Sequence, residues 1–201
     1  MKSRWQSRST VHCVATLNRL NSERLVLSTT SRGFRIAAFS LEEMWDAIET
    51  RVLIDCEALG RSIVNGDDEW EARLVGTYHA PTLAANRDAP DLRDQIEGTD
   101  VLETRHMEFH QALISACGSR WLIGLSTQLC DQTERYRQPI LRRRSEWGAA
   151  RNVRQEHQDL KDAALARNTD EATTLLAEHY RETGRMIELT RKNLEHTGKD
   201  E

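Results

Sequence analysis

Four of the seven histidines in this chain occur at spacings that could bring their imidazole rings together. His106 and His110 are four residues apart, so on a helix they lie one turn apart on the same face. His157 and His179 lie equally far on either side of Asn168, in a segment of turn and capping residues. If this segment joins two antiparallel helices, both rings stand at the same height, roughly 16 Å from the turn. The spacing therefore predicts a four-histidine cluster inside a helical bundle.

Four neutral imidazoles suit Zn²⁺, Ni²⁺ or another borderline transition metal, whereas Mg²⁺ and Ca²⁺ prefer oxygen ligands. We therefore expect a divalent transition metal, with Zn²⁺ and Ni²⁺ the best-suited ions, at His106, His110, His157 and His179. The alternative for each histidine is a core residue with a hydrogen-bond partner. The matched positions of all four favour the metal.

The same residues give little support for a metal-dependent enzyme. The string from His106 to His110 superficially resembles a zinc-protease motif, but that motif has a glutamate directly after its first histidine. Here Glu108 is the second residue after His106, about 200° around the helix, and we expect it to point away from the site. The sequence places no other general base, so we expect a binding protein and keep an enzyme as an alternative.

Long amphipathic segments after residue 39 must position these rings. The chain has only three prolines, and Ser40 with Glu43 forms a capping-box pattern that begins the first segment. An apolar stripe then continues to Ile63, and the Gly-Asp-Asp string at 66–68 ends one helix and starts the next. The expected helices cover about 41–65, 68–84, 100–117, 119–139, 149–167 and 170–194, with a loop over 85–99 and a kink or end at Pro139. The predicted fold class is mainly α, a six-helix antiparallel bundle.

The first 36 residues differ from the rest of the chain in charge. They carry seven basic residues and one acidic residue, against 21 basic and 31 acidic residues in the remainder, or +6 against −10 within a total of −4. A helix is expected over about 10–22, followed by strand-prone runs at 25–27 and 34–36, with Gly33 able to adopt positive φ. A helix and a basic hairpin form the closing half of a winged helix-turn-helix, and a basic head suits a polyanion.

These observations divide the chain into three parts. We expect a partial winged helix-turn-helix at 1–38, the helical bundle at 39–196 and a disordered tail at 197–201. No run is apolar enough to span a membrane, and the first residues lack the apolar core of a signal peptide, so we expect a cytoplasmic protein with no membrane partner. Four cysteines without a CxxC pair fit a reducing compartment as small buried side chains: Cys13, Cys56, Cys117 and Cys130.

Several strings resemble the effector-binding FCD domain of GntR-type bacterial transcription regulators of the FadR group. They are RGFRIA at 32–37, SLEEM at 40–44, EFHQAL at 108–113, ACGS at 116–119, QEHQDL at 155–160 and LAEH at 176–179. The resemblance covers nearly everything after residue 15. The strings CEAL at 56–59 and NGDDEWEAR at 65–73 look closest to the carbon-starvation-induced regulator branch.

The resemblance implies a metal site of one aspartate and three histidines that helps to bind a small carboxylate effector. The three histidines correspond to His110, His157 and His179, and His106 stands where the family has the aspartate. Both an all-histidine site and a site of three ligands with His106 aside are compatible with this departure.

The resemblance also implies a homodimer in which the effector changes the spacing of the paired DNA-binding heads. In the family, arginines help to hold the effector carboxylate, and the candidates here are Arg51 and Arg135. The candidate DNA-binding residues are Arg19, Arg32, Gly33 and Arg35. Val14 stands where the family's recognition helix has an arginine, and few residues precede this stretch, so we expect a shortened head with weak DNA binding. The alternative is a sensor of metal and organic acid that has lost DNA binding.

Overall fold

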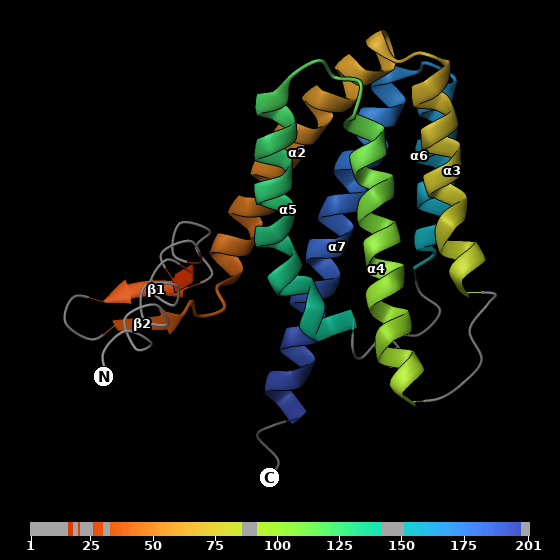
Figure 1. Cartoon of the computed structure of the whole chain (residues 1–201). Coiled ribbons are helices and arrows are strands. Elements are labelled where there is room, and N and C mark those ends of the chain that lie inside the picture. Colours follow the sequence, from red (N-terminus) through yellow and green to blue (C-terminus); the bar gives the residue numbers. More distant parts are fainter. Residues whose placement is uncertain are drawn as a thin grey trace, which may run out of the picture.

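The computed structural model describes residues 16–17, 20, 26–29, 33–85, 92–141 and 151–197. Within these residues it contains a two-stranded sheet and six helices, which confirms the mainly α fold. The elements in chain order are β1 (Val26–Thr29), β2 (Gly33–Ile36), α2 (Leu41–Asn65), α3 (Asp68–Ala85), α4 (Leu92–Ile114), α5 (Arg120–Leu141), α6 (Val153–Leu165) and α7 (Thr169–Thr197). Figure 1 shows the helices gathered in one bundle, with the hairpin beside the start of α2.

The two strands form the expected hairpin. They pair antiparallel, with Val26 opposite Ile36 and Thr29 opposite Gly33. Gly33 has a φ of 81°, a conformation that residues with a Cβ rarely adopt. Of the helix expected over 10–22, residues 16–17 and 20 are described and are helical, and the others lie outside the described residues.

Helix α2 begins where the capping pattern predicts. Ser40 is its N-cap, and the Ser40 hydroxyl accepts a hydrogen bond from the backbone N–H of Glu43 at 3.2 Å. One face of the helix is buried along its length, by Met44, Ile48, Val52, Ala58, Leu59 and Ile63. This face packs against α7 and α5, which makes α2 a central support of the bundle.

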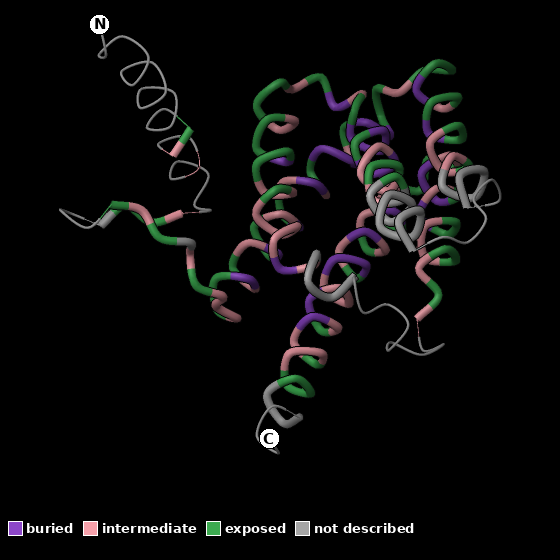
Figure 2. Tube along the Cα trace, turned by 60° about the horizontal axis from the view of Figure 1, so that its bottom comes forward, coloured by how far each residue is buried: buried purple, intermediate pink, exposed green. Residues whose placement is uncertain are grey.

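Helix α7 approaches α2 closely at Gly184. A Cβ at this position would lie 2.7 Å from Cη2 of Trp45 and 2.8 Å from Cδ1 of Ile48. Any larger residue would therefore have to displace one of these side chains. Figure 2 shows that buried residues lie on the inner sides of α2 and α7, whereas their outer sides are exposed.

The turn between α6 and α7 is fastened to the turn between α2 and α3. Arg167 lies in the first of these turns, and its guanidinium donates to the carbonyl oxygen of Ile63 at 2.6 Å and to that of Gly66 at 2.9 Å. It also forms an ion pair with Glu71. A cation at the C-terminal carbonyls of α2 is favourable, so this contact fixes the height of the α6–α7 hairpin in the bundle.

Helix α4 begins earlier than predicted. It starts at Leu92 instead of about residue 100, so the second half of the expected loop over 85–99 is helical. The polarity of this segment led to the wrong prediction, although Arg, Asp, Gln and Glu are all compatible with a helix. Pro90 lies before the first residue of the helix, where it does not interrupt the helical hydrogen bonds.

Helix α5 continues past Pro139 to Leu141, and Figure 1 shows its last part turned away from the axis of the rest, in agreement with the expected kink. Two other boundaries differ from the expectation. Helix α6 begins at Val153 instead of residue 149, because Asn152 caps it by accepting from the N–H of Gln155 at 3.1 Å. Helix α7 reaches Thr197, and the rest of the predicted tail lies outside the described residues.

No helix in the described part of the chain combines the length and the apolar character that crossing a membrane requires.

Candidate metal centre

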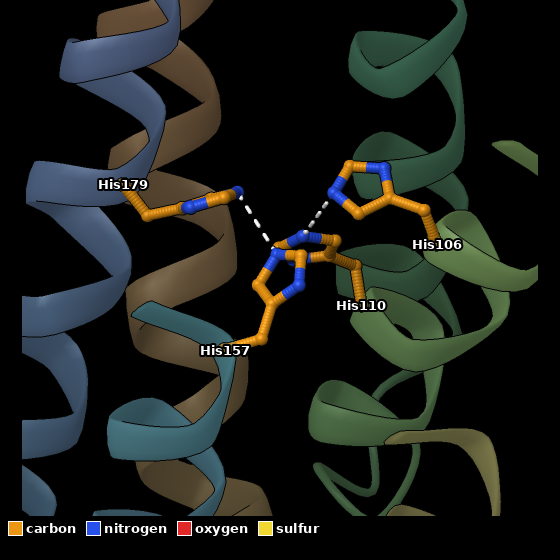
Figure 3. A group of neighbouring side chains, drawn as sticks. All are labelled: His106, His110, His157 and His179. Carbon is orange, nitrogen blue, oxygen red and sulfur yellow. Dashed lines mark hydrogen bonds between the residues drawn. The ribbon is translucent and has the colours of Figure 1, made fainter. Parts of the chain in front are cut away.

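The four histidines meet in the middle of the bundle, and Figure 3 shows their rings converging from α4, α6 and α7. Their ligand nitrogens all lie within 4.8 Å of one another, at His106, His110, His157 and His179. The Nε2 atoms of His106 and His110 are 3.1 Å apart, and those of His157 and His179 are 3.3 Å apart. The sequence spacing therefore predicted correctly that these four side chains come together.

Buried apolar neighbours hold the helices that carry these rings. Phe109 and Leu113 anchor α4, Leu160 anchors α6 and Leu176 anchors α7, each 1% exposed or less. His110 and His179 are themselves only 5% and 6% exposed. The cluster is thus built on the rigid core of the bundle and not on loops.

A carboxylate lies behind the ring of His179. Its Nδ1 is 2.8 Å from Oε2 of Glu156, and Nη2 of Arg151 donates to the same oxygen at 2.6 Å and to the carbonyl of His179 at 2.9 Å. These two bonds use both hydrogens of that Arg151 nitrogen, which also lies 3.2 Å from Nδ1. Although burial opposes it, the hydrogen bonds from His179 and Arg151 lower the pKa of Glu156 to about 2. Nδ1 of His179 therefore donates to an ionised carboxylate, which leaves the Nε2 lone pair directed into the cluster.

A phenol lies behind the ring of His110. Burial raises the pKa of Tyr180 well above its usual value, so the hydroxyl keeps its proton and donates it to Oδ2 of Asp55 at 2.8 Å. The Tyr180 oxygen lies 3.4 Å from Nδ1 of His110 and can accept a hydrogen bond from it. This relay also leaves the Nε2 lone pair of His110 directed into the cluster.

A guanidinium, by contrast, lies behind the ring of His106. Nη1 of Arg137 is 3.0 Å from Nδ1 of His106. Arg137 is held in place by Glu134, to which its Nη2 donates at 2.6 Å, and by an ion pair with Glu103. His106 is thus backed by a cation that donates to its Nδ1, whereas His179 is backed by the Arg151–Glu156 ion pair, whose carboxylate accepts from its Nδ1.

All four rings are neutral in this environment. Burial is the largest cause that lowers the pKa of each ring, and for His106, His110 and His157 it lowers the pKa well below the usual value. The second causes are the charge of Arg137 for His106, the ring of His106 for His110 and the ring of His179 for His157. For His179, the hydrogen bond to Glu156 acts in the opposite direction, but its pKa is still lowered. A neutral imidazole is the form that binds a metal ion.

The cluster opens into a cavity lined by both polar and apolar residues. The free space is about 410 Å³ when it is counted out to the solvent opening. The apolar lining includes Ile48 and Ile187, and the polar lining includes Arg51, Thr133 and Arg137. Nε of Arg51 donates to Asp55 and its Nη1 donates to Thr133, both at 3.1 Å, so this guanidinium is held at the cavity wall.

Of the two arginines proposed from the sequence, Arg51 lies in the cavity wall and Arg135 does not. Arg135 instead contacts Glu43 and its neighbour Tyr136. Arg137, which the sequence reasoning missed, lines the cavity from the same helix. Residues two positions apart on a helix point about 200° away from each other. Which of Arg135 and Arg137 faces the cavity therefore depends on how α5 is rotated against α4. Glu156 and Arg151 were also missed, and of these only Glu156 carried a signal, as the neighbour of His157.

The spacing of His157 and His179 fits two ligands of a tetrahedral transition metal. Two nitrogens at Zn–N distances of about 2.0–2.1 Å lie about 3.3 Å apart in that geometry. The Nε2 atoms of His157 and His179 are separated by 3.3 Å. Glu108, the acid of the superficial protease motif, pairs with Arg105 at 2.7 Å and does not line the cavity.

Comparison with known proteins identifies the bundle. The family model of the FCD domain matches residues 46–182, which include all four histidines. The chain belongs to the FCD domain family. This membership confirms the resemblance drawn from the sequence strings, and it is a family of regulators, in agreement with the expectation of a non-enzymatic protein.

Two curated relatives of this FCD regulator are HTH-type transcriptional proteins. The regulator BphR of Paraburkholderia xenovorans (strain LB400) is 40% identical over 180 residues, which cover 89% of this chain and 70% of BphR. The repressor GlaR of Escherichia coli (strain K12) is 32% identical over 164 residues, which cover 81% of this chain and 72% of GlaR.

Solved structures share the fold at lower identity. A GntR family regulator from Pseudomonas syringae pv. tomato str. DC3000 has a TM-score of 0.61 and 19% identity, covering 90% of this chain and 70% of that structure. McbR/YncC of Escherichia coli has a TM-score of 0.68 and 15% identity, covering 87% of this chain and 78% of that structure.

The candidate DNA-binding residues are described only in part. Gly33 and Arg35 are exposed on β2, whereas Arg19 and Arg32 lie outside the described residues.

Proposed function

We propose that this FCD regulator is an effector-responsive DNA-binding protein whose bundle holds a divalent transition metal, Zn²⁺ or Ni²⁺, and binds a small carboxylate there. The observation that carries the proposal is the convergence of the four histidines, His106, His110, His157 and His179, with ligand nitrogens within 4.8 Å of one another. Their neutral rings, buried at His110 and His179 and half-buried at His106 and His157, and the partners behind them support metal binding more than a structural hydrogen-bond cluster.

A carboxylate suits the polar lining of this cavity. Arg51 and Arg137 both line it, and a guanidinium matches a carboxylate in shape and charge. When bound, the metal would supply further positive charge beside these two guanidiniums. Ile48 and Ile187 offer an apolar surface to the hydrocarbon part of the effector.

The position of the site suggests how effector binding reaches the head. The histidines link α4, α6 and α7, and Arg51 extends the site to α2. Only residues 37–40 separate β2 from the start of α2. An effector that favours one arrangement of these helices therefore shifts the population of α2 positions, and with it the hairpin.

We further propose that the protein acts as a homodimer, because a regulator of this class reads two half-sites. The adjacent helices α2 and α5 carry exposed apolar side chains that a second copy could cover: Leu53, Val64, Trp121 and Leu125. Trp121 is 83% exposed, which is unusual for so large an apolar side chain. Trp121→Arg should convert a dimer to a monomer in light scattering, while the exposed-surface change Arg120→Ala should not.

The candidate DNA contacts follow from the basic charge of the first 36 residues and are Arg19, Arg32, Gly33 and Arg35, of which Gly33 and Arg35 are described and exposed. Arg35→Ala should weaken DNA binding and reduce its salt dependence, because one phosphate contact is lost. Salt-independent binding, or none at all, would favour the alternative of a sensor without DNA activity.

The metal and effector proposal is tested by metal analysis and thermal unfolding. Purified protein should contain about one zinc or nickel ion per chain, and some mono- or dicarboxylates should raise its unfolding temperature. His179→Ala should lose both the metal and this response. The matched control is His79→Ala, which removes an exposed histidine on α3 outside the cluster. An equal carboxylate response in wild type and His179→Ala would refute the site.

A further inference from the structure

Arginine imposes a direction on the hydrogen bond to His106. A guanidinium keeps its protons in proteins and has donors only. Nη1 of Arg137, 3.0 Å from Nδ1 of His106, must therefore donate, and Nδ1 must accept. Because the ring is neutral, its one N–H is then at Nε2.

The neighbouring ring agrees with this assignment. Nε2 of His106 lies 3.1 Å from Nε2 of His110, and where no metal ion binds both nitrogens this contact is favourable only if one carries a proton and the other accepts it. Nδ1 of His110 faces the Tyr180 hydroxyl, whose own proton goes to Asp55, so the proton of His110 is at Nδ1. Nε2 of His110 is the acceptor and Nε2 of His106 is the donor.

His106 therefore lacks the free lone pair that a metal ligand needs at Nε2. To coordinate through this atom, it would have to place its N–H at Nδ1, against the N–H of Arg137. That exchange would lose a hydrogen bond and set two donors against each other. Glu134 and Glu103 hold the guanidinium on its other side, so Arg137 cannot simply turn away. His179 and His110 meet no such obstacle, because the Arg151 nitrogen near His179 directs its two hydrogens to Glu156 and to the His179 carbonyl, and the Tyr180 oxygen can accept from His110.

We propose that His110, His157 and His179 hold the metal, and that His106 serves as a hydrogen-bond donor to a carboxylate oxygen at the remaining coordination position. This inference rests on the proposed function, because it divides roles within the same site. The His106–Arg137 pair then recognises the effector instead of the metal. Arg51 can bind the second oxygen, since its Nη2 has no hydrogen-bond acceptor among the described residues and it lines the same cavity.

The first experiment separates metal binding from carboxylate binding by substitution. Zn²⁺ affinity is measured by competition with a chromophoric chelator, and acetate and succinate are then titrated into the zinc-loaded protein by calorimetry. His106→Leu should bind Zn²⁺ within about threefold of wild type but bind the carboxylates at least about tenfold more weakly, because a charge-assisted hydrogen bond is lost. His179→Ala should lose Zn²⁺ affinity by about 100-fold or more.

His106→Gln is the matched control. The glutamine amide can accept from Arg137 through its oxygen and donate through its nitrogen, as the proposed form of His106 does. It should keep both Zn²⁺ and carboxylate affinity within about threefold of wild type. Carboxylate binding in this variant that is as weak as in His106→Leu would contradict the donor role.

The second experiment needs no substitution in the protein that is measured. Nitrogen-15 spectra of histidine-labelled, zinc-loaded wild type report which ring nitrogen carries a proton. The signals of the His106 ring are those that are missing from the spectrum of His106→Gln, and they should show a protonated Nε2. The other three site rings should show a protonated Nδ1 and a metal-bound Nε2.

The outcomes distinguish the two proposals. Equal loss of Zn²⁺ affinity in His106→Leu and His179→Ala, or a metal-bound Nε2 in His106, would overturn this inference and leave the metal site standing. Wild type that binds no Zn²⁺, or zinc-loaded wild type that binds neither carboxylate, would overturn the proposed function and this inference with it.

Discussion

The two sides of the histidine cluster look alike in sequence but differ in what lies behind the rings. On the α6–α7 side, the ionised carboxylate of Glu156 accepts from His179. On the α4 side, the guanidinium of Arg137 donates to His106, and one helical turn away a phenol accepts from His110. The partner behind each ring decides which nitrogen presents a lone pair to the centre. Four equivalent histidines in a sequence can therefore be unequal in chemistry.

The largest expected effect is a dependence of the free energy of unfolding on pH. It follows from the feature that both sides share, the neutral rings inside the bundle. In the folded protein, the pKa values of His106, His110 and His157 are lowered well below the usual value of about 6.5 that the unfolded chain keeps. As the pH falls below about 6.5, the unfolded chain binds protons that the folded protein does not, so the free energy of unfolding falls until the lower folded pKa values are reached. Each ring can lower the free energy of unfolding by at most about 1.4 kcal/mol per pH unit. Three rings together can lower it by up to about 4 kcal/mol per pH unit.

Denaturant unfolding of the metal-free protein between about pH 7.5 and 5 measures this slope. His106→Leu should reduce the change of the free energy of unfolding with pH by the contribution of one ring. A free energy of unfolding that does not change with pH would show that the rings are not buried as described.

The next largest effect is the loss of Zn²⁺ affinity when a proposed ligand is removed. His157→Ala should lower Zn²⁺ affinity by about 100-fold or more, because it removes a nitrogen that lies 3.3 Å from Nε2 of His179. Chelator competition measures the affinity, and circular dichroism checks that the helices remain. If His157→Ala kept wild-type affinity while His106→Leu lost it, the roles of the two sides would be reversed.

Removing the charge behind His179 should have a smaller effect. Glu156→Gln keeps the shape of the side chain but loses the carboxylate that accepts from Nδ1, so Zn²⁺ affinity should fall about tenfold. Glu178→Gln is the matched control, since this carboxylate precedes His179 directly but pairs with Arg181 and Arg185. Equal losses in the two variants would point to a general charge effect instead of the specific hydrogen bond.

The smallest effect is expected behind His110. Tyr180→Phe removes the oxygen that lies 3.4 Å from Nδ1, a long hydrogen bond, so Zn²⁺ affinity should fall only about threefold. The same change should lower the free energy of unfolding by about 1 kcal/mol, because Asp55 loses a buried donor. A loss as large as that of Glu156→Gln would mean that the two sides support the metal equally.

The features that local patterns determine were predictable from the sequence. The cap at Ser40, the hairpin around Gly33 and the equal height of His157 and His179 depend on residues close in the chain or on one turn. The start of α4 was missed because polarity marks exposure and does not exclude a helix. Arg137 was missed in favour of Arg135, because the rotation of α5 against α4 follows from packing between distant residues.

Gly184 has a mechanical consequence for signalling. At this point the α7 backbone rests directly on Trp45 and Ile48, with no side chain of its own between the helices. A side chain could change rotamer and absorb a small displacement, whereas a bare backbone cannot. In the proposed response to an effector, a movement of α7 at His179, little more than one turn earlier, would therefore be passed directly to α2. Under that proposal, the smallest residue would supply the stiff contact between the two helices.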